Sequence, residues 1–196
     1  MIPRTDTDLV WIDVETTGLD PARDWLLEVA VAVTDTDLNM RDGRAWVVGG
    51  WPEGEGGYLL SKMSPEVTTM HGGSGLLAEV ARADASTTTV DRALRQWLSA
   101  PRWTPSEKDG FVMCGSSVHF DREFVRRCLP RSFELFGHRI VDVSTVKTMV
   151  KMWWPDLAYD SQAPKAHRAA LDIQASIGEL RYYRSLMKVF EPATES

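Results

Sequence analysis

Cysteine is scarce in this sequence, as are long apolar runs and any excess of positive charge. The 196 residues include two cysteines, Cys114 and Cys128. Their spacing fits neither a zinc site nor a disulfide framework, so a reducing compartment is expected. No apolar core segment follows the first six residues, which disfavours a secretory signal. The longest apolar stretch, 26–33, contains Glu28 and is too short to span a bilayer. These absences predict a cytoplasmic protein without a membrane segment.

The charge balance is acidic. Lys and Arg number 22 and Asp and Glu 28, which gives a net charge of -6. Gripping long nucleic acid through its phosphates requires a basic surface, so the composition disfavours that mode of binding. A small anionic substrate remains compatible if metal ions and a few placed cations supply the neutralising charge. The length and the 43% hydrophobic content predict one domain over residues 1–196.

The hydrophobic pattern predicts a mixed α/β sheet with helices on both faces. The predicted strands run from residue 9 to a turn at 18–21, and over 25–34, 44–48, 111–115 and 138–141. The first three are joined by short turns, which is typical of an antiparallel meander. The glycine-rich segment 51–58 is expected to be an exposed loop.

Helix signals fill most of the remaining sequence. One helix is predicted to start at Ser64–Pro65–Glu66, and a second to cover 75–83 with Ser74 as its N-cap. The others are predicted from Thr88 or Thr89, as N-cap, to Leu98, over 121–129 up to Pro130, over 144–153 and over 165–190. An apolar stripe at the spacing of one buried face supports the last helix. It comprises Ala166, Ala170, Ile173, Ile177, Leu180 and Met187.

Two carboxylates, Asp13 and Glu15, lie within the first predicted strand. Residues i and i+2 of a strand point to the same face, roughly 6–7 Å apart, so the two side chains project together. Burying unpaired charge disfavours folding, and a pair of divalent cations would compensate for it. Taken alone, however, an Asp-x-Glu pair is better explained as solvated acids at a strand end.

Three further residues extend this candidate site. Asp121 comes where a predicted strand gives way to a helix, which is where α/β sheets bind ligands; the alternative is an ordinary first-turn acid. His167 and Asp172 are five residues apart, about 500° on an ideal helix, so two helical residues would not share a face. We therefore expect His167 in a loop or loose first turn and Asp172 inside the helix. Taken singly, His167 is readily explained as a surface histidine and Asp172 as a capping or surface acid.

Together the five residues are a more specific pattern than any one of them. Four carboxylates are hard oxygen ligands that suit Mg²⁺ or Mn²⁺ rather than zinc. A neutral imidazole can take a proton from water near neutral pH. The set fits two-metal hydrolysis of a phosphodiester, in which one ion generates hydroxide and both stabilise the in-line transition state.

Four segments resemble the DEDDh 3′→5′ exonucleases, and most closely the oligoribonucleases. They are WIDVETTGLDPARDWLLEVAVAVTDTDLN, CGSSVHFDREF, DVSTVKTMVKMWWPD and HRAALDIQASIGELRYYRS. The resemblance covers most of the chain, is weakest at 51–110, and implies an RNase H-like (DnaQ-like) fold that releases nucleoside 5′-monophosphates. It also implies metal ligands at Asp13, Glu15, Asp121 and Asp172 and a general base at His167.

The resemblance extends to substrate binding. Oligoribonucleases hold the 5′ phosphate of a very short substrate with a histidine, two serines and an arginine, the arginine coming from the second subunit of a dimer. The matching positions here are His71, Ser117, Ser144 and Arg139, and Leu19 matches the residue that wedges against a base. Ser144 and Arg139 are almost equally well explained as a helix cap and an exposed cation.

Three positions depart from the family pattern. Glu66 replaces an aromatic wedge, His138 replaces the tyrosine before the partner's arginine, and 115–117 reads Gly-Ser-Ser instead of Gly-Asn-Ser. Base–aromatic stacking contributes roughly 1–3 kcal/mol per base, so losing both rings relaxes a preference for dinucleotides. The implied partners are a short single-stranded oligonucleotide, RNA in preference to DNA, and a second copy of the chain, with 144–154 at the interface and Arg139 acting in trans.

Two other functions stay open. A DnaQ-like exonuclease that acts on single-stranded DNA ends would use the same five residues, and Glu66 and His138 favour it modestly. A catalytically silent nucleic-acid-binding or partner-binding module on the same fold is disfavoured, because such a module has no reason to retain all four acids and the histidine.

Overall fold

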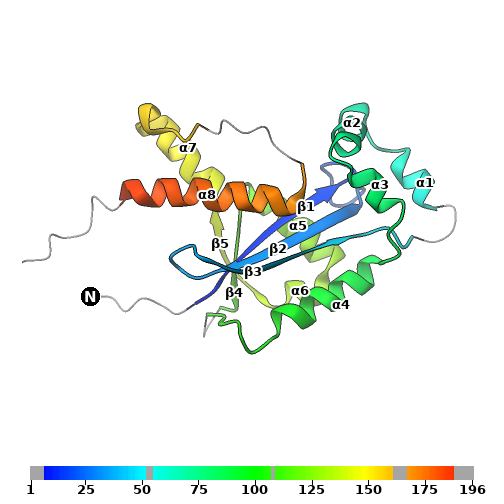
Figure 1. Cartoon of the computed structure of the whole chain (residues 1–196), viewed down its shortest axis with the longest axis horizontal. Helices are drawn as coiled ribbons and strands as arrows, with labels where there is room; N and C mark the ends of the chain where they lie inside the picture. Colours follow the sequence, from blue (N-terminus) through cyan, green and yellow to red (C-terminus); the bar gives the residue numbers. More distant parts are fainter. Residues whose placement is uncertain (1–6, 52–54, 107–108, 161–166, 188–196) are drawn as a thin grey trace, which may run out of the picture.

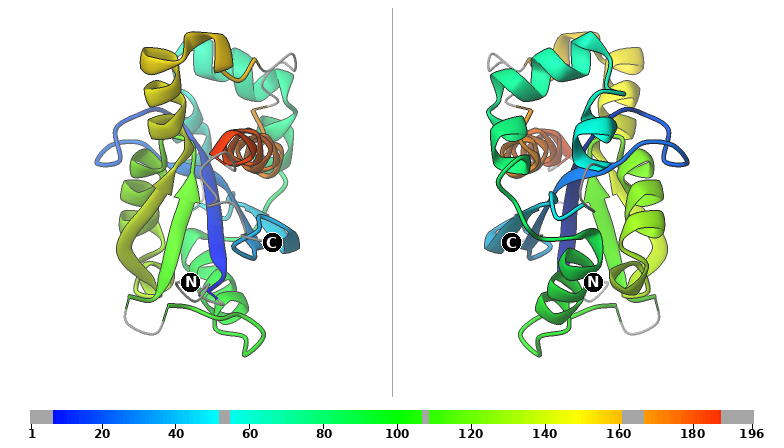
Figure 2. Two further views of the ribbon diagram at one scale, coloured as in Figure 1. Left: turned by 90° about the vertical axis from the view of Figure 1, so that its left-hand side faces the viewer. Right: turned by 90° about the vertical axis from the view of Figure 1, so that its right-hand side faces the viewer.

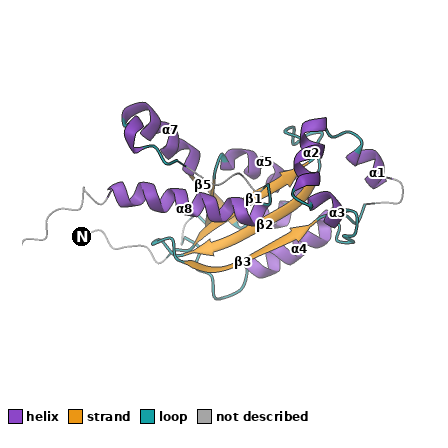
Figure 3. Cartoon of the chain, turned by 45° about the horizontal axis from the view of Figure 1, so that its top comes forward, coloured by secondary structure: helices purple, strands orange, loops and turns teal. Residues whose placement is uncertain are grey.

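The structure, a computed structural model, describes residues 7–51, 55–106, 109–160 and 167–187. Its centre is a five-stranded sheet in the order β3-β2-β1-β4-β5, with helices against both faces (Figure 1, Figure 3). The strands are β1 Leu9–Thr16, β2 Leu26–Thr34, β3 Met40–Val47, β4 Phe111–Gly115 and β5 Phe136–Asp142. The mixed α/β architecture predicted from the sequence is confirmed.

The central strand β1 pairs antiparallel with β2, and β2 pairs antiparallel with β3, so the meander is also confirmed. On its other side β1 runs parallel to β4, and β4 parallel to β5. β3 begins at Met40, earlier than the predicted residue 44. The reason is the preceding turn, in which an Asp35 oxygen accepts the N–H groups of Asp37 and Asn39 at 2.8 and 2.9 Å. The chain reverses tightly there and pairs with β2 at once.

Helices account for most of the other described residues. They are α1 Glu55–Leu60, α2 Pro65–Gly73, α3 Leu76–Val80, α4 Thr87–Leu98, α5 Val118–Cys128, α6 Pro130–Phe133, α7 Val143–Trp153, the 3₁₀ turn η1 Pro155–Leu157 and α8 Ala169–Met187. One face of the sheet packs against α4 and α5, and the other against α7 and α8. Both side views place α8 and α5 on opposite sides of β1 (Figure 2). Within the described ranges, no helix combines the length and the apolar character that crossing a bilayer requires.

Two helix caps differ from the prediction. Ser86, rather than Thr88 or Thr89, is the N-cap of α4, and its hydroxyl accepts the N–H of Thr89. Ser74 does not cap α3, because Gly75, at a φ of 78°, directly precedes that helix. Serine and threonine are both good caps, so a run of them does not indicate which residue acts. The predicted start of α2 after Ser64 is confirmed.

Two boundaries also differ. The segment 51–58, predicted to be a loop, contains the start of α1 at Glu55, while 52–54 lie outside the described residues. α5 begins at Val118, ahead of the predicted residue 121. The proline predicted to end this helix also opens α6, since proline suits the first helical turn.

The last helix is shorter than the predicted 165–190, of which 165–166 and 188–190 lie outside the described residues. Its buried face also differs, because Ala170 and Met187 are exposed. The buried residues are Ala169, Ile173, Ser176, Ile177, Glu179 and Tyr183. Two of them are polar and are satisfied by hydrogen bonds, Ser176 with Ser116 and Glu179 with Tyr183. An apolar stripe alone could not have identified them.

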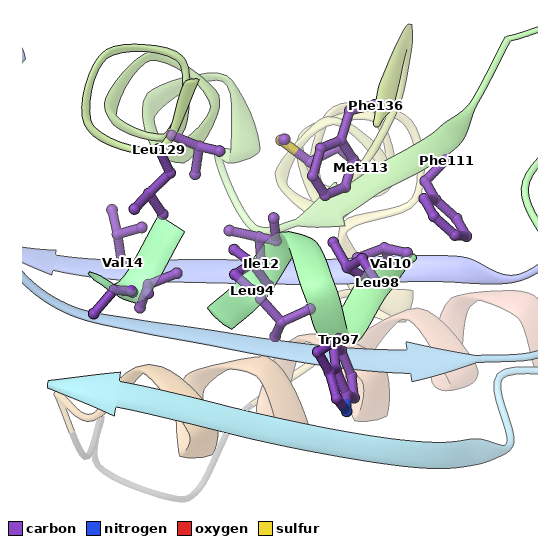
Figure 4. Packing of buried hydrophobic residues seen from close by; sticks show 14 of the residues in the cluster. Val10, Ile12, Val14, Leu94, Trp97, Leu98, Phe111, Met113, Leu129 and Phe136 are labelled. Carbon is purple, nitrogen blue, oxygen red and sulfur yellow. The ribbon is translucent and has the colours of Figure 1, made fainter. Parts of the chain in front are cut away.

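β1 is buried on both faces, and its alternation decides where its acids point. Val10 and Val14 belong to the cluster that packs with α4 and α5 (Figure 4). Trp11 belongs to the cluster on the opposite face, with residues of α8. Asp13 and Glu15 follow Trp11 at intervals of two and therefore share its face. The fold thus directs both carboxylates toward α8.

Candidate active site

Three acids meet between β1 and the first turn of α8. Asp13, Glu15 and Asp172 each offer a carboxylate oxygen, and these oxygens lie within 4.8 Å of one another. Glu15 is buried, whereas Asp13 and Asp172 are half-buried and accessible from solvent. The structure therefore brings together three of the four acids predicted from the sequence.

The fourth acid, Asp121, lies in the first turn of α5 and is 3% exposed. Its Oδ1 accepts the N–H of Val14 at 2.9 Å, between the two acids of β1. β4 pairs with β1 only along Leu9 to Trp11, so the strands separate before this point and leave room for the carboxylate. Asp121 thus lies beside the acids of β1, outside the three-acid cluster, and its charge contributes to raising the pKa of Glu15.

Burial and mutual repulsion raise the pKa values of two of these acids. The pKa of Glu15 rises to about 8, chiefly through burial and then through the charges of Asp172, Glu28 and Asp121. Burial likewise raises the pKa of Asp121 to about 7. Four hard oxygen donors, two of which have raised pKa values, fit a divalent cation, because such an ion favours their ionised forms. The donor set therefore agrees with the divalent-metal dependence expected of this chemistry.

His167 stands outside α8, in the left-handed region at a φ of 50°, and Asp172 lies in the helix's first turn. This is the arrangement that their five-residue separation predicts. The imidazole is half-buried. The pKa of His71 is lowered, mainly because His71 is buried, and the neighbouring His167 contributes to the lowering. The two imidazoles are therefore electrostatic neighbours.

His71 is fully buried, which differs from the phosphate contact predicted for it. Its Nε2 donates to the carbonyl of Thr16 at 2.9 Å, and its Nδ1 lies 3.8 Å from a Glu15 oxygen. Nδ1 has no hydrogen-bond partner among the described residues. In this conformation the imidazole of His71 is bonded to the last residue of β1 and does not present a donor to a substrate. The sequence could not reveal this, because the burial depends on how α2 packs.

Ser117 and Ser144, predicted to bind a phosphate, lie side by side with their hydroxyl oxygens 3.1 Å apart. Asp142 holds both, since its Oδ1 accepts the N–H of each serine at 2.9 Å. Asp142 is also the N-cap of α7, so Ser144 is not the cap of that helix. Ser117 is exposed and Ser144 half-buried, and their hydroxyls form a polar pair at the carboxyl ends of β4 and β5.

The two remaining predicted residues are on the surface. Leu19 is 81% exposed in the loop that follows β1. Arg139 lies on the edge strand β5, where its guanidinium pairs with Asp109 at 3.3 Å. This position agrees with the interpretation of Arg139 as an exposed cation within one subunit.

The sequence did not single out two other residues that border the site. Glu28 of β2 is directly opposite Glu15 in the sheet and is 2% exposed. Its carboxylate pairs with Arg168, the residue that follows His167. The signal for Glu28 was present, because it is the charged residue inside an otherwise apolar strand. Arg168 had no comparable signal.

Comparison with known proteins gives matches over nearly the whole chain. Residues 10–180 match the model of the Exonuclease (RNase T) family. The oligoribonuclease of Vibrio cholerae is 36% identical over 92% of this chain and 95% of its own length. The oligoribonucleases of Corynebacterium diphtheriae and Streptomyces coelicolor are 39% and 40% identical, over 98% and 96% of this chain and 89% and 90% of their own lengths.

Solved structures of longer exonucleases share the fold. The zinc-bound form of the E. coli ExoI–ssDNA complex has a TM-score of 0.68 at 16% identity, covering 94% of this chain and 42% of that one. An exonuclease I from Methylocaldum szegediense has a TM-score of 0.67 at 20% identity, covering 91% of this chain and 40% of that one. The chain therefore spans less than half of each of these proteins.

Proposed function

Because this chain belongs to the Exonuclease family, with oligoribonucleases as its relatives, and is a 3′→5′ exonuclease, we propose that it degrades short oligoribonucleotides to nucleoside 5′-monophosphates. The observation that supports the proposal most directly is the meeting of Asp13, Glu15 and Asp172 within 4.8 Å, with His167 two residues before α8. The enzyme would act in the cytoplasm as one domain over residues 1–196.

The proposed site holds two divalent cations, Mg²⁺ or Mn²⁺. Asp13, Glu15 and Asp172 would supply their carboxylates, and Asp121 would complete the set from α5. When bound, the ions would lower the pKa of a water molecule and offset the negative charge that develops at the scissile phosphate. The half-buried positions of Asp13 and Asp172 keep the cluster open to a substrate phosphate.

His167 is the proposed general base. Its imidazole would accept the proton of the water that attacks phosphorus, while the bond from phosphorus to the 3′ oxygen of the preceding nucleotide breaks and that oxygen gains a proton. The nucleotide released keeps its 5′ phosphate. The position of His167 outside α8 supports this role, because an imidazole before the helix start can turn toward the cluster that Asp172 enters from the first turn.

Ser117 and Ser144 are the proposed contacts for the 5′ phosphate of the substrate, with Leu19 against a base. Two adjacent hydroxyls can donate together to phosphate oxygens. Arg139 is exposed on the edge strand β5, where a second chain can approach it. We propose that it reaches the site of the partner subunit in a homodimer. His71 would join these contacts only after its imidazole leaves Thr16.

An apolar surface on α7 and η1 supports the homodimer. Its exposed residues are Met149, Met152, Trp153, Trp154 and Leu157. Contiguous exposed apolar side chains of this size are typical of interaction sites. The surface includes the last turns of α7, and Ser144 lies in the first turn of the same helix, so pairing there would bring a second chain close to the proposed phosphate contacts.

The proposal is tested with a diribonucleotide and a longer oligoribonucleotide, each labelled at its 5′ end, in the presence of Mn²⁺. We expect release of mononucleotides from both, and loss of that release in Asp121→Ala. Absence of mononucleotides with the wild-type protein, or full activity of Asp121→Ala, would refute it.

A second candidate, trimming of single-stranded DNA ends, is favoured by the residues at the two wedge positions. Glu66, exposed in the first turn of α2, supplies no ring, and His138, exposed on β5, supplies a smaller imidazole in place of the expected phenol ring. Rates measured side by side on single-stranded DNA and RNA of equal length decide between the two substrates. A higher kcat/KM on DNA at every length would favour the second candidate.

A further inference from the structure

The guanidinium of Arg168 joins two elements that are distant in the sequence. Its Nη2 donates to Glu28 Oε1 of β2 at 2.9 Å. Its Nη1 and Nη2 donate to the two oxygens of Glu79 in α3, each at 2.8 Å. Arg168 is about one quarter exposed, at 24%, and Glu28 is buried. Planar, two-pronged pairing of this kind is geometrically specific, and a lysine cannot reproduce it.

The backbone of Arg168 opens α8. Its carbonyl accepts the N–H groups of Leu171 and Asp172 at 2.9 and 3.1 Å. The next N–H, that of Ala169, donates to Glu28 Oε2 at 3.0 Å. Glu28 therefore satisfies one of the free N–H groups at the helix start and places a negative charge at the positive end of the helix dipole. One buried carboxylate thus holds both the side chain and the helix start.

His167 directly precedes this anchor and has a φ of 50°. Residues other than glycine seldom adopt left-handed backbone, and such a residue persists where the surrounding structure holds it there. The anchor at Arg168 supplies that restraint. His167 lies on the N-terminal side of this anchor. Asp172 lies on its C-terminal side and donates its N–H to the Arg168 carbonyl.

We propose that Arg168 is a positioning residue, whose clamp between Glu28 and Glu79 sets the turn that places both His167 and Asp172 against the acids of β1. The inference rests on the proposed function for the roles of those two residues. Arg168 itself touches neither substrate nor metal in this scheme. It acts through the geometry of the chain on both sides of it.

The two clamped acids differ in consequence. Glu79 is on the surface, with its side chain 41% exposed, so its loss leaves Arg168 paired with Glu28. Loss of Arg168 leaves Glu28 as a buried carboxylate without its cation, at the point where α8 begins. We therefore expect the largest losses of kcat and Mn²⁺ affinity in Arg168→Gln, smaller losses in Arg168→Lys and the smallest in Glu79→Gln.

The same helix offers a matched control. Arg184, in the last turn of α8, donates from Nη1 to the Asp37 carbonyl at 3.0 Å and pairs with the Asp37 carboxylate. Arg184→Gln also removes an arginine that tethers α8, here to the turn between β2 and β3, but at the end of the helix remote from His167. Any effect that comes only from loosening the helix should appear in both variants.

The experiment compares the wild-type full-length chain with Arg168→Gln, Arg168→Lys, Glu79→Gln and Arg184→Gln. Thermal unfolding, Mn²⁺ affinity by titration calorimetry without substrate, and kcat and KM on a diribonucleotide are measured for each. For Arg168→Gln we expect kcat to fall by about 10²-fold, the effect of misplacing a reacting group by about 1 Å, with little change in KM. Its Mn²⁺ affinity should fall roughly 10- to 100-fold. Arg184→Gln should lower the melting temperature alone.

The inference is overturned if Arg168→Gln keeps wild-type kcat and Mn²⁺ affinity, or if Arg184→Gln loses as much of both. If Arg168→Gln does not fold, the graded losses expected of Arg168→Lys and Glu79→Gln carry the same test. A wild-type protein that binds Mn²⁺ but releases no mononucleotide contradicts the proposed function instead. The Mn²⁺ affinities of the variants then still decide whether Arg168 places Asp172.

Discussion

Glu15 and Glu28 face each other directly across β1 and β2, but they have different neighbours. Glu28 is paired with Arg168 at 2.9 Å, while Glu15 lies with Asp13 and Asp172. Two buried carboxylates side by side repel each other, and Glu28 contributes to the raised pKa of Glu15. The sheet therefore holds one carboxylate, Glu28, that Arg168 neutralises, and one, Glu15, whose ionisation burial and neighbouring acids oppose.

The first prediction concerns stability without metal. Glu15 has a pKa of about 8 in the folded protein against an ordinary 4.5, so the folded state binds its proton more tightly than the unfolded state. This contribution to the free energy of unfolding is complete when the pH is below the ordinary pKa of 4.5, and it is lost as the pH rises through the pKa of the folded state. We expect the melting temperature in chelator to fall between about pH 5 and about pH 8. Thermal unfolding in that range, with Glu15→Gln as the control, measures it.

Glu15→Gln should weaken this dependence and leave the part that Asp121 contributes through its own raised pKa. Mn²⁺ should raise the melting temperature of the wild type more at the alkaline end, because the ion competes with the proton. Equal melting temperatures of the metal-free wild type across the range would contradict the prediction.

The second prediction concerns Asp172. Asp172→Asn removes a charged ligand from the cluster and should lower kcat by at least about 10³-fold, as expected for losing several kcal/mol of charge stabilisation. Without metal the same variant should unfold at an equal or higher temperature, because one of the charges that repel Glu15 is gone. Single-turnover assays and thermal melts test both parts. Asp84→Asn, an exposed acid between α3 and α4, is the control and should change neither.

The third prediction concerns proton transfer. At saturating Mn²⁺ the rate should increase with pH, because a general base accepts a proton only in its unprotonated form. His167→Ala should be roughly 10²- to 10⁴-fold slower and should lack this increase. Saturating metal is needed because Glu15 also loses its proton as the pH rises, which would strengthen metal binding and raise the rate at lower metal concentrations. The exposed His119 is the control, and His119→Ala should keep the increase; the same increase in His167→Ala would exclude His167 as the base.

The fourth prediction is that Arg139 acts in trans. Arg139→Ala and His167→Ala should each be inactive on a diribonucleotide as homodimers. In a mixed dimer, one site combines an intact His167 with the partner's intact arginine. Random exchange of subunits in a two-fold dimer should then restore about one quarter of wild-type activity. Activity of the mixture no greater than that of the separate variants, after exchange is shown by mass spectrometry, would place Arg139 in its own subunit's site.

The fifth prediction concerns the dimer surface. Met152 is 63% exposed on α7, so Met152→Glu should not disturb the fold but should place a charge within an apolar contact. Light scattering should show a dimer for the wild type and a monomer for the variant, with a parallel loss of activity on dinucleotides. A wild-type monomer that is fully active on dinucleotides would contradict it. Glu134→Gln, on the opposite side of the sheet, serves as the control.

Local patterns were sufficient for the elements whose burial follows from their own residues. The Val- and Leu-rich β2 and the short apolar β4 were predicted nearly to the residue, and α2 begins after Ser64 as predicted. The predictions were poorer where a contact from elsewhere decides. The start of β3 depends on the Asp35 turn, and the cap of α4 was assigned to the wrong member of a run of similar residues.

The candidate site divides in the same way. By its own periodicity the sequence determined that Asp13 and Glu15 share a face of β1, and that His167 and Asp172 need a helix start between them. Both follow from backbone geometry, which acts between near neighbours in the chain. The burial of His71 and the clamp of Arg168 by Glu28 were decided only by the tertiary structure. Glu28 and Arg168 are 140 residues apart, and only the packing of α8 against β2 brings their charges together.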